Sequence, residues 1–160
     1  MEIDNAISCG SALSVLGQVE KRLERRERIL VVDDDAEMRE LLEEGLQEEG
    51  YLTSAAGDTL SAIIHLLARP VDVLVLDWKM PDLDGFVLLK SVRRLFPELP
   101  VIFISAHNHP EVHRRAIESG AFGFLAKPFP LRLLLAEVQG ATAEIRRVTA
   151  DETISSRDRT

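Results

Sequence analysis

Short apolar runs alternate with longer segments of helical periodicity from residue 29 onwards, and this alternation constrains the fold more than any other feature. The apolar runs occupy residues 29–33, 51–56, 71–77, 100–105 and 121–126. Alternating strands and helices imply right-handed crossovers, a parallel sheet and helices on both of its faces. The pattern therefore predicts one doubly wound α/β domain with five strands over residues 29–148.

Apolar residues recur at helical spacing after each apolar run, as Met38, Leu42 and Leu46 do after the first. The predicted helices cover residues 36–50, 59–68, 85–95, 111–119 and 131–148. Gly50 and Gly120 stand where helices are expected to end, and Pro110 stands where one is expected to begin. The run at 51–56 is less apolar than the others, which indicates a strand near a sheet edge.

Two polar segments flank the predicted domain. Residues 1–28 contain Leu13, Leu16, Val19 and Leu23, a spacing compatible with an amphipathic helix, although a charged extension without fixed structure fits equally well. Residues 149–160 form a polar tail that is expected to be disordered. The tail is far too short to be a second domain.

The charge and the cysteine content exclude several classes of protein. The net charge is −8, from 19 basic and 27 acidic residues, which argues against a surface that binds nucleic acid or anionic lipid through bulk charge. A single cysteine, Cys9, excludes an internal disulfide. No apolar run approaches the roughly 18 residues of a membrane span, and the first thirty residues lack a secretion signal. We interpret the chain as cytoplasmic, with no direct nucleic-acid or membrane partner.

Polar side chains stand where the predicted strands end. Asp33 and Asp34 follow the first strand, Asp77 ends the third, Ser105 ends the fourth and Lys127 follows the fifth. Ligands of open α/β sheets bind outside the carboxyl ends of the strands. We therefore expect three carboxylates, a hydroxyl and an ammonium group at one edge of the sheet.

This set of side chains favours a metal-assisted reaction at phosphorus. A loop that cradles phosphate needs glycines and backbone N–H donors, whereas the acidic stretch 33–38 would repel phosphate. Mg²⁺ prefers carboxylate oxygens, and beside the metal one carboxylate can attack phosphorus to form an aspartyl phosphate. Lys127 and Ser105 can then contact the phosphoryl oxygens. Asp35 precedes a helix and is expected to be its N-cap instead of a metal ligand.

Four motifs in this order resemble the receiver domain of bacterial two-component response regulators, which has the CheY-like or flavodoxin-like fold. They are VVDD at 31–34, DxxMPDxDG at 77–85, ISA at 104–106 and GAFGFLAKPF at 120–129. The resemblance covers residues 29 to about 148. It implies a single domain with the strand order 2-1-3-4-5.

The resemblance also implies roles for the acidic residues. Asp77 corresponds to the aspartate that accepts a phosphoryl group from the phosphohistidine of a sensor histidine kinase or phosphotransfer protein. Asp34 corresponds to a direct ligand of Mg²⁺, and Asp33 to a residue bonded to a metal-bound water. The backbone carbonyl of Lys79 corresponds to the third protein ligand, with Asp77 itself in the metal site.

Four further residues match the part of the family that senses phosphorylation. Lys127 corresponds to the lysine that contacts the phosphoryl group, and the following Pro128 suggests a cis peptide bond. Ser105 occupies the hydroxyl switch position and Phe124 the aromatic switch position. The hydroxyl would bond a phosphoryl oxygen and leave space into which the ring can swing.

The expected function is a signalling switch and not an enzyme with a turnover substrate. Its output would be a contact with a downstream protein through the face formed by helix 111–119, strand 121–126 and helix 131–148. Leu133 on the last helix is expected to be exposed, which indicates a surface for a partner or for a homodimer on that helix.

Two other classes remain open. The chain could be a receiver cut from a longer DNA-binding response regulator or hybrid kinase, and the discriminating observation is whether the reading frame continues past Thr160. A Mg²⁺-dependent aspartyl-phosphate hydrolase fits less well. Such hydrolases resemble a pattern with the nucleophile in a DxD motif on the first strand and carry a cap domain, and this chain offers neither.

Overall fold

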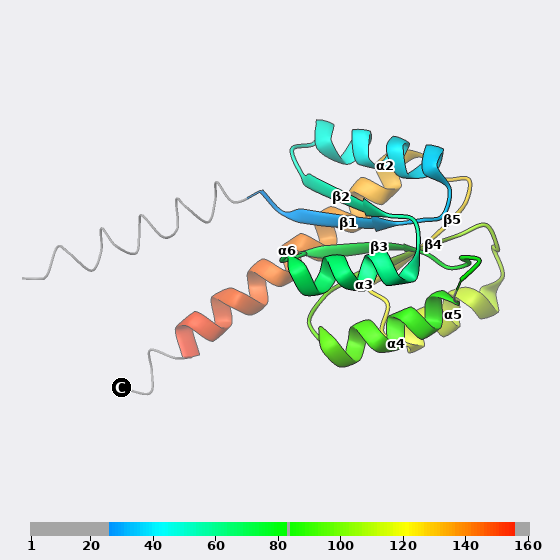
Figure 1. Cartoon of the computed structure of the whole chain (residues 1–160). Coiled ribbons are helices and arrows are strands. Elements are labelled where there is room, and N and C mark those ends of the chain that lie inside the picture. The colour runs from blue at the N-terminus through cyan, green and yellow to red at the C-terminus, as the bar shows by residue number, and fades with distance from the viewer. Residues whose placement is uncertain (1–25, 83, 156–160) are drawn as a thin grey trace, which may run out of the picture.

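The computed structural model describes residues 26–82 and 84–155, with side chains described as far as residue 148. Strands and helices alternate along the chain (Figure 1). Their bounds are β1 Arg28–Val32, α2 Ala36–Glu48, β2 Leu52–Ala56, α3 Thr59–Ala68, β3 Val73–Asp77, α4 Gly85–Leu95, β4 Val101–Ser105, α5 Pro110–Glu118, β5 Gly123–Ala126 and α6 Leu131–Ser155.

The five strands form one parallel sheet in the order β2-β1-β3-β4-β5. This is the predicted doubly wound order, and β2 is the edge strand that its weaker apolar pattern indicated. Strands β3 and β4 are buried along their whole length, as expected for central strands that helices cover on both faces.

Alternate residues of the central strands face two separate hydrophobic cores. Leu30 and Leu74 pack in the core beneath α3, α4 and α5. Their neighbours Val31 and Val75 pack in the core beneath α2 and α6. Figure 1 shows these two helical layers on opposite faces of the sheet. The period-two alternation along each strand places one row of side chains in each core.

Aspartates that follow strands or precede helices cap three helices. Asp35 Oδ1 accepts hydrogen bonds from the backbone N–H groups of Glu37 and Met38, at 3.0 and 3.3 Å. Asp58 caps α3 and Asp84 caps α4 in the same manner. The carboxylates satisfy N–H groups that have no partner within the helix. The prediction that Asp35 is an N-cap is therefore confirmed.

The last helix differs from its prediction. The expected boundary was residue 148, followed by a disordered tail, but α6 continues to Ser155. No glycine or proline interrupts residues 149–155, and extending an existing helix adds one hydrogen bond for each residue ordered. Polar composition alone does not end a helix. The rest of the tail and residues 1–25, including Cys9 and the predicted amphipathic stripe, lie outside the described residues.

Small shifts at the other boundaries have local causes. The fifth strand begins at Gly123 and not at 121, because the chain first turns through Gly120, whose φ is +93°. Gly50 has a φ of +90° after α2, a conformation that glycine adopts without steric cost. Among the described residues, no helix is both long enough and apolar enough to cross a membrane.

Candidate functional site

The sheet register brings the two acidic strand ends to the same level. Val32 of β1 pairs with Leu76 of β3, so the next residues, Asp33 and Asp77, are neighbours at the carboxyl edge. Backbone bonds continue this edge across the sheet, since Trp78 N–H donates to the carbonyl of Ile104 at 2.8 Å. Lys127 N–H donates to the carbonyl of Ser105 at 2.7 Å. The predicted convergence of the strand ends is therefore present.

Three carboxylates form a cluster at this edge. Asp33, Asp34 and Asp77 each offer an oxygen atom, and these atoms lie within 4.8 Å of one another. Asp33 is fully buried and Asp77 is 6% exposed, whereas Asp34 is exposed. One open position beside two buried carboxylates gives a small ligand access from solvent.

Lys127 is the cation of the cluster. Its Nζ lies 2.8 Å from Asp33 Oδ2 and 3.2 Å from Asp77 Oδ1. The Lys127–Pro128 peptide bond is cis, as predicted. Burial lowers the pKa of Lys127, but the hydrogen bond to Asp33 and the charges of Asp77 and Asp33 outweigh this effect, so its pKa lies above the ordinary value. The side chain is therefore a permanent positive charge.

Burial of Asp77, together with the charge of Asp33, raises its pKa to about 6, against the opposing effect of Lys127; Asp34 adds to the rise. One ammonium group thus only partly neutralises three carboxylates. A divalent cation would supply the missing positive charge.

The donor set fits Mg²⁺. Mg²⁺ binds a few carboxylate oxygens and completes its shell with water and phosphate oxygens. The cluster has these oxygens close together, an excess of negative charge and an exposed side at Asp34. We conclude that Asp33, Asp34 and Asp77 are the described side chains that can hold the metal.

The three adjacent aspartates have different tasks. Asp33 accepts hydrogen bonds on both oxygens, from the N–H of Asp35 at 2.9 Å and from Lys127. Asp34 points into the carboxylate cluster. The side chain of Asp35 is engaged with helix α2, so it is separate from the candidate metal site.

Ser105 and Phe124, the two residues at the predicted switch positions, lie at the end of β4 and on β5. Ser105 is buried, and its Oγ accepts a hydrogen bond from the N–H of His107 at 3.0 Å. Phe124 is half-buried on β5, and its ring centroid lies 5.2 Å from that of His113 on α5. Lys79 lies in the loop after Asp77 and forms an isolated bridge with Asp84.

Two contacts that support the site carry no signal in the sequence. Arg39 on α2 donates to the backbone carbonyl of Asp33 at 2.6 Å. Asp82, in the loop after β3, accepts from the N–H of Thr59 at 2.8 Å and so joins that loop to the start of α3. Both are long-range or cross-element contacts that only the folded arrangement creates.

Gly85, the last residue of the DxxMPDxDG motif, is required by packing and not by an unusual backbone conformation, since its φ is not positive. A Cβ atom at this position would lie 2.7 Å from the carbonyl oxygen of Trp78 and 3.0 Å from Phe103 Cε1. Gly85 is required because the backbone after Asp77 approaches it closely.

Gly85→Ala is therefore expected to destabilise the protein by about 1–3 kcal/mol, because backbone atoms must move to admit the methyl group. Urea unfolding measures this change. Gly140→Ala is the matched control, since its Cβ would meet only Phe122 at an ordinary 3.6 Å. This helical alanine is expected to stabilise the protein by up to about 1 kcal/mol. Equal effects of the two substitutions would contradict the close-approach explanation.

The metal-free protein is expected to lose stability as the pH rises from about 4 to about 6. The pKa of Asp77 is about 6 in the folded state, against an ordinary value of 3.8. The folded state therefore holds this proton more tightly, and the associated stability disappears once the pH passes the folded pKa. At pH of about 8, Asp77→Asn should be more stable than wild type by on the order of 2 kcal/mol.

Urea unfolding in a chelating buffer at several pH values measures this difference. Near pH of about 3.5 both proteins carry a neutral side chain, so their free energies of unfolding should converge. A difference that is the same at both ends of the pH range would show that Asp77 is not the titrating group.

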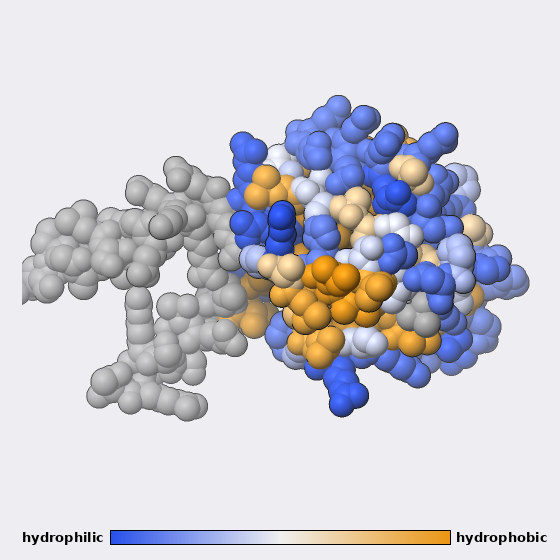
Figure 2. Space-filling view, viewed as in Figure 1, coloured by the Kyte–Doolittle hydropathy of each residue, from blue (hydrophilic) through white to orange (hydrophobic). Residues whose placement is uncertain are grey.

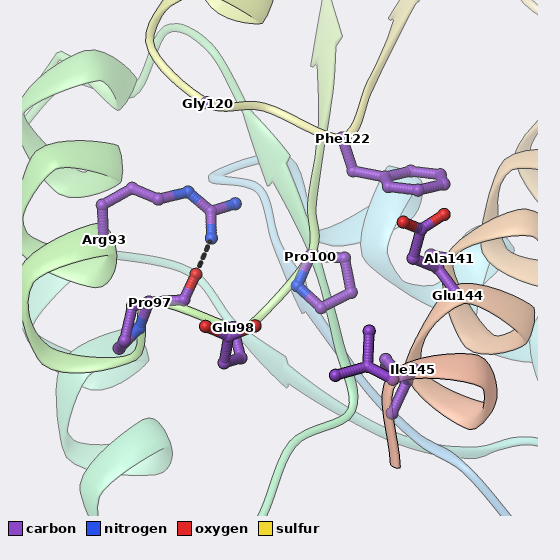
Figure 3. A pocket seen from close by; sticks show the side chains of 10 residues that line it. Arg93, Pro97, Glu98, Pro100, Gly120, Phe122, Ala141, Glu144 and Ile145 are labelled. Atoms are coloured by element: carbon purple, nitrogen blue, oxygen red, sulfur yellow. Dashed lines mark hydrogen bonds between the residues drawn. The ribbon is translucent and has the colours of Figure 1, made fainter. Parts of the chain in front are cut away.

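A cavity of about 500 Å³ lies away from the carboxylates (Figure 3). Its lining includes Pro100 and Phe122, which precede β4 and β5, and Ile145 of α6. Arg93 reaches into its wall and donates to the carbonyl of Pro97 at 2.9 Å. The cavity thus opens at the amino ends of the strands, and the acidic site lies at their carboxyl ends.

Comparison with known proteins identifies the class of protein. A sequence profile of the response regulator receiver domain matches residues 29–139. The chain belongs to this family, whose members are signalling switches that bind Mg²⁺ at an acidic pocket and interact with histidine kinases and downstream effectors. The strand order and the CheY-like resemblance predicted above are thereby confirmed.

Two curated relatives are longer than this chain. The DNA-binding transcriptional regulator NtrC of Proteus hauseri is 40% identical over 121 residues, which are 74% of this chain and 25% of NtrC. The response regulator MprA of Mycobacterium bovis is 34% identical over 130 residues, which are 81% of this chain and 56% of MprA. The match therefore spans a quarter to just over half of these relatives.

Solved receiver domains superpose along almost their whole length. The receiver domain of NtrX from Brucella abortus is 38% identical with a TM-score of 0.69, covering 72% of this chain and 98% of that one. The receiver domain of the Francisella response regulator 1452 is 32% identical with a TM-score of 0.72, covering 75% of this chain and 99% of that one.

Proposed function

We propose that this chain is a phosphorylation-dependent switch in which Asp77 accepts a phosphoryl group. The donor would be the phosphohistidine of a sensor histidine kinase or of a phosphotransfer protein. The observation that carries the proposal is the clustering of Asp33, Asp34 and Asp77 within 4.8 Å, with Lys127 Nζ 3.2 Å from Asp77. This arrangement brings together a nucleophile, a metal-binding site and a cation that can contact the phosphoryl oxygens.

The transfer exchanges one bond to phosphorus for another. A carboxylate oxygen of Asp77 attacks phosphorus, and the phosphorus–nitrogen bond breaks with its electron pair returning to the imidazole of the donor. Lys127 donates to a phosphoryl oxygen and opposes the charge that gathers there. Because Lys127 already contacts Asp77, it needs little rearrangement to reach the product.

Mg²⁺ would be held by Asp33, Asp34 and Asp77 together with the backbone carbonyl of Lys79. When bound, it neutralises carboxylate and phosphoryl charge so that the two anionic groups can approach. Asp33 and Asp34 orient the metal, and Asp77 keeps one oxygen for phosphorus. Hydrolysis of the product by water returns Asp77 to its free carboxylate, so the chain turns over no substrate beyond its own phosphoryl group.

Phosphorylation would be read through Ser105 and Phe124. The new oxygens at Asp77 compete with the carbonyl oxygen of His107, to which the Ser105 hydroxyl donates at 3.4 Å in the unphosphorylated protein. As Ser105 moves toward the phosphoryl group, the half-buried ring of Phe124 can turn inward and leave His113. The surface of α5, β5 and α6 then changes shape, which biases one state of a two-state switch.

The output of the switch would be a protein contact at the face formed by α5, β5 and α6. Leu133 of α6 is 44% exposed, and this face could bind a downstream protein or a second copy of the chain. The proposal also includes a cytoplasmic location, which rests on the family.

A second candidate is a receiver that serves a longer DNA-binding regulator. The relative NtrC favours it, since that protein is named as DNA-binding and the match covers a quarter of its length. Sequencing the transcript beyond the codon for Thr160 discriminates between the two, because an open frame of domain length would place the output in the additional domain.

Incubation with a small phosphodonor and Mg²⁺ tests the proposal. Acetyl phosphate or phosphoramidate should add a single phosphoryl group that is stable in acid and labile in base, and peptide mapping should place it on Asp77. Failure to incorporate phosphate from either donor, or incorporation on another residue, would overturn the proposal.

A further inference from the structure

Helix α3 is apolar on the face that points away from the sheet as well as on the face that packs against it. Ala62 and Leu66 are buried beneath it. On the outer face Leu60, Ile64 and Leu67 are 67%, 57% and 66% exposed. A helix that is hydrophobic on all sides is normally buried, so the outer face of α3 requires a cover.

The exposed residues form a continuous patch. Figure 2 shows apolar side chains gathered over α3, and the apolar surface extends onto α4, where Val87 is 47% exposed. Among the described residues no large apolar side chain is more exposed than Leu60 or Leu67. Contiguous patches of this kind mark interaction sites.

The chain that precedes β1 joins the domain at the same edge as the end of α3. The N–H of Arg28, the first residue of β1, donates to Asp72 Oδ2 at 2.8 Å, and the N–H of Asp72 donates back to the carbonyl of Arg28 at 2.8 Å. Asp72 follows the end of α3 at Ala68 by four residues. Figure 1 shows the start of β1 and the end of α3 at the same edge of the molecule.

The 25 residues that precede Arg26 carry an apolar stripe that matches the patch. Leu13, Leu16, Val19 and Leu23 would span about 15 Å along a helix, and the three outer residues of α3 span about 10 Å. Residues 24–27 are the tether between the stripe and β1, and four extended residues reach about 14 Å, so Leu23 must dock near the end of α3 at this edge. A short tether also raises the effective concentration to the millimolar range, which favours this occupant over a separate molecule.

We infer that residues 13–23 dock as an amphipathic helix on the outer face of α3. Their apolar side chains cover Leu60, Ile64 and Leu67. Lys21 and Arg22 lie on the other sides of the docked helix and stay in water. The docking needs neither Mg²⁺ nor phosphorylation, so it is independent of the proposed switch and can be tested separately.

The single cysteine makes this inference measurable in the full chain. A nitroxide attached to Cys9, four residues before the stripe, is expected to broaden the amide NMR signals of α3. The Ile64→Asp and Leu16→Asp variants should each restore those signals, because a charge at the contact costs more than the docking supplies. Leu41→Asp is the matched control, since Leu41 is 58% exposed on α2, which belongs to the helical layer on the other face of the sheet. The broadening should persist in this variant.

Two chains are then mixed: one carries the spin label and no isotope, and the other carries the isotope and no spin label. Broadening in this mixture can only come from contact between two molecules. Broadening that appears in this mixture, with a doubled mass in light scattering, would show that a second copy covers α3 and would overturn the inference. Signals of α3 that are unaffected by the label in the wild-type chain, or broadening that survives Ile64→Asp, would overturn it as well.

Discussion

Asp77→Asn is expected to abolish phosphoryl incorporation from acetyl phosphate in the presence of Mg²⁺. An amide oxygen of asparagine is a poor nucleophile and carries no charge to share with a metal. The substitution keeps the shape of a side chain that is 6% exposed and close to Lys127. Loss of incorporation would therefore report lost chemistry and not a collapsed site, and mass spectrometry of the intact protein measures it.

Asp82→Asn is the control for this experiment. Asp82 lies in the loop that follows Asp77, but its carboxylate accepts from the N–H of Thr59, a bond that the asparagine oxygen can retain. Incorporation should be unchanged in this variant. If Asp77→Asn still took up one phosphoryl group with acid-stable, base-labile chemistry, another carboxylate of the cluster would be the acceptor.

Asp34→Ala is expected to weaken Mg²⁺ binding by at least roughly tenfold, because it removes a charged oxygen ligand from the exposed side of the cluster. Asp35→Ala should change the affinity by less than about twofold. Trp78 is the only tryptophan and directly follows Asp77, so its fluorescence in a Mg²⁺ titration reports occupancy in both variants.

Asp35→Ala should lower the stability more than Asp34→Ala does, which is the reverse of their order of effect on Mg²⁺ affinity. Asp35→Ala removes the N-cap of α2 and is expected to lower the free energy of unfolding by about 1 kcal/mol. Asp34→Ala relieves repulsion in the metal-free protein and should not lower it. Comparable losses of Mg²⁺ affinity in the two variants would show that the roles within 33–35 are not divided in this manner.

The strands, most of the helices and the residues of the acidic edge could be predicted from the sequence. Periodicity is a local property, so residues such as 73–77 and 85–95 are recognisable without their neighbours in space. Alternating strands and helices make the sheet parallel, so the carboxyl ends of the strands meet at one edge, whereas the strand order was implied by the family resemblance. This is why Asp33, Asp77 and Lys127 could be placed at one edge before any distance was known.

The interactions among those groups depend on the folded arrangement. The contacts of Lys127 with Asp33 and Asp77 join residues that are far apart in the chain, and the raised pKa of Asp77 depends on its burial among them. The need for glycine at 85 likewise comes from a carbonyl seven residues earlier that the folded loop brings to its Cα. Distances of this kind are set by packing, which no local pattern encodes.

The same division separates α6 from α3. The sequence marked the start of α6 but not its end, because polar residues without glycine or proline are compatible with helix and with coil alike. For α3 it indicated an apolar helix, and only the folded domain shows which side is left uncovered: the sheet buries Ala62 and Leu66, and Leu60, Ile64 and Leu67 face outward. Periodicity identifies apolar residues, whereas burial depends on what the rest of the chain places against them.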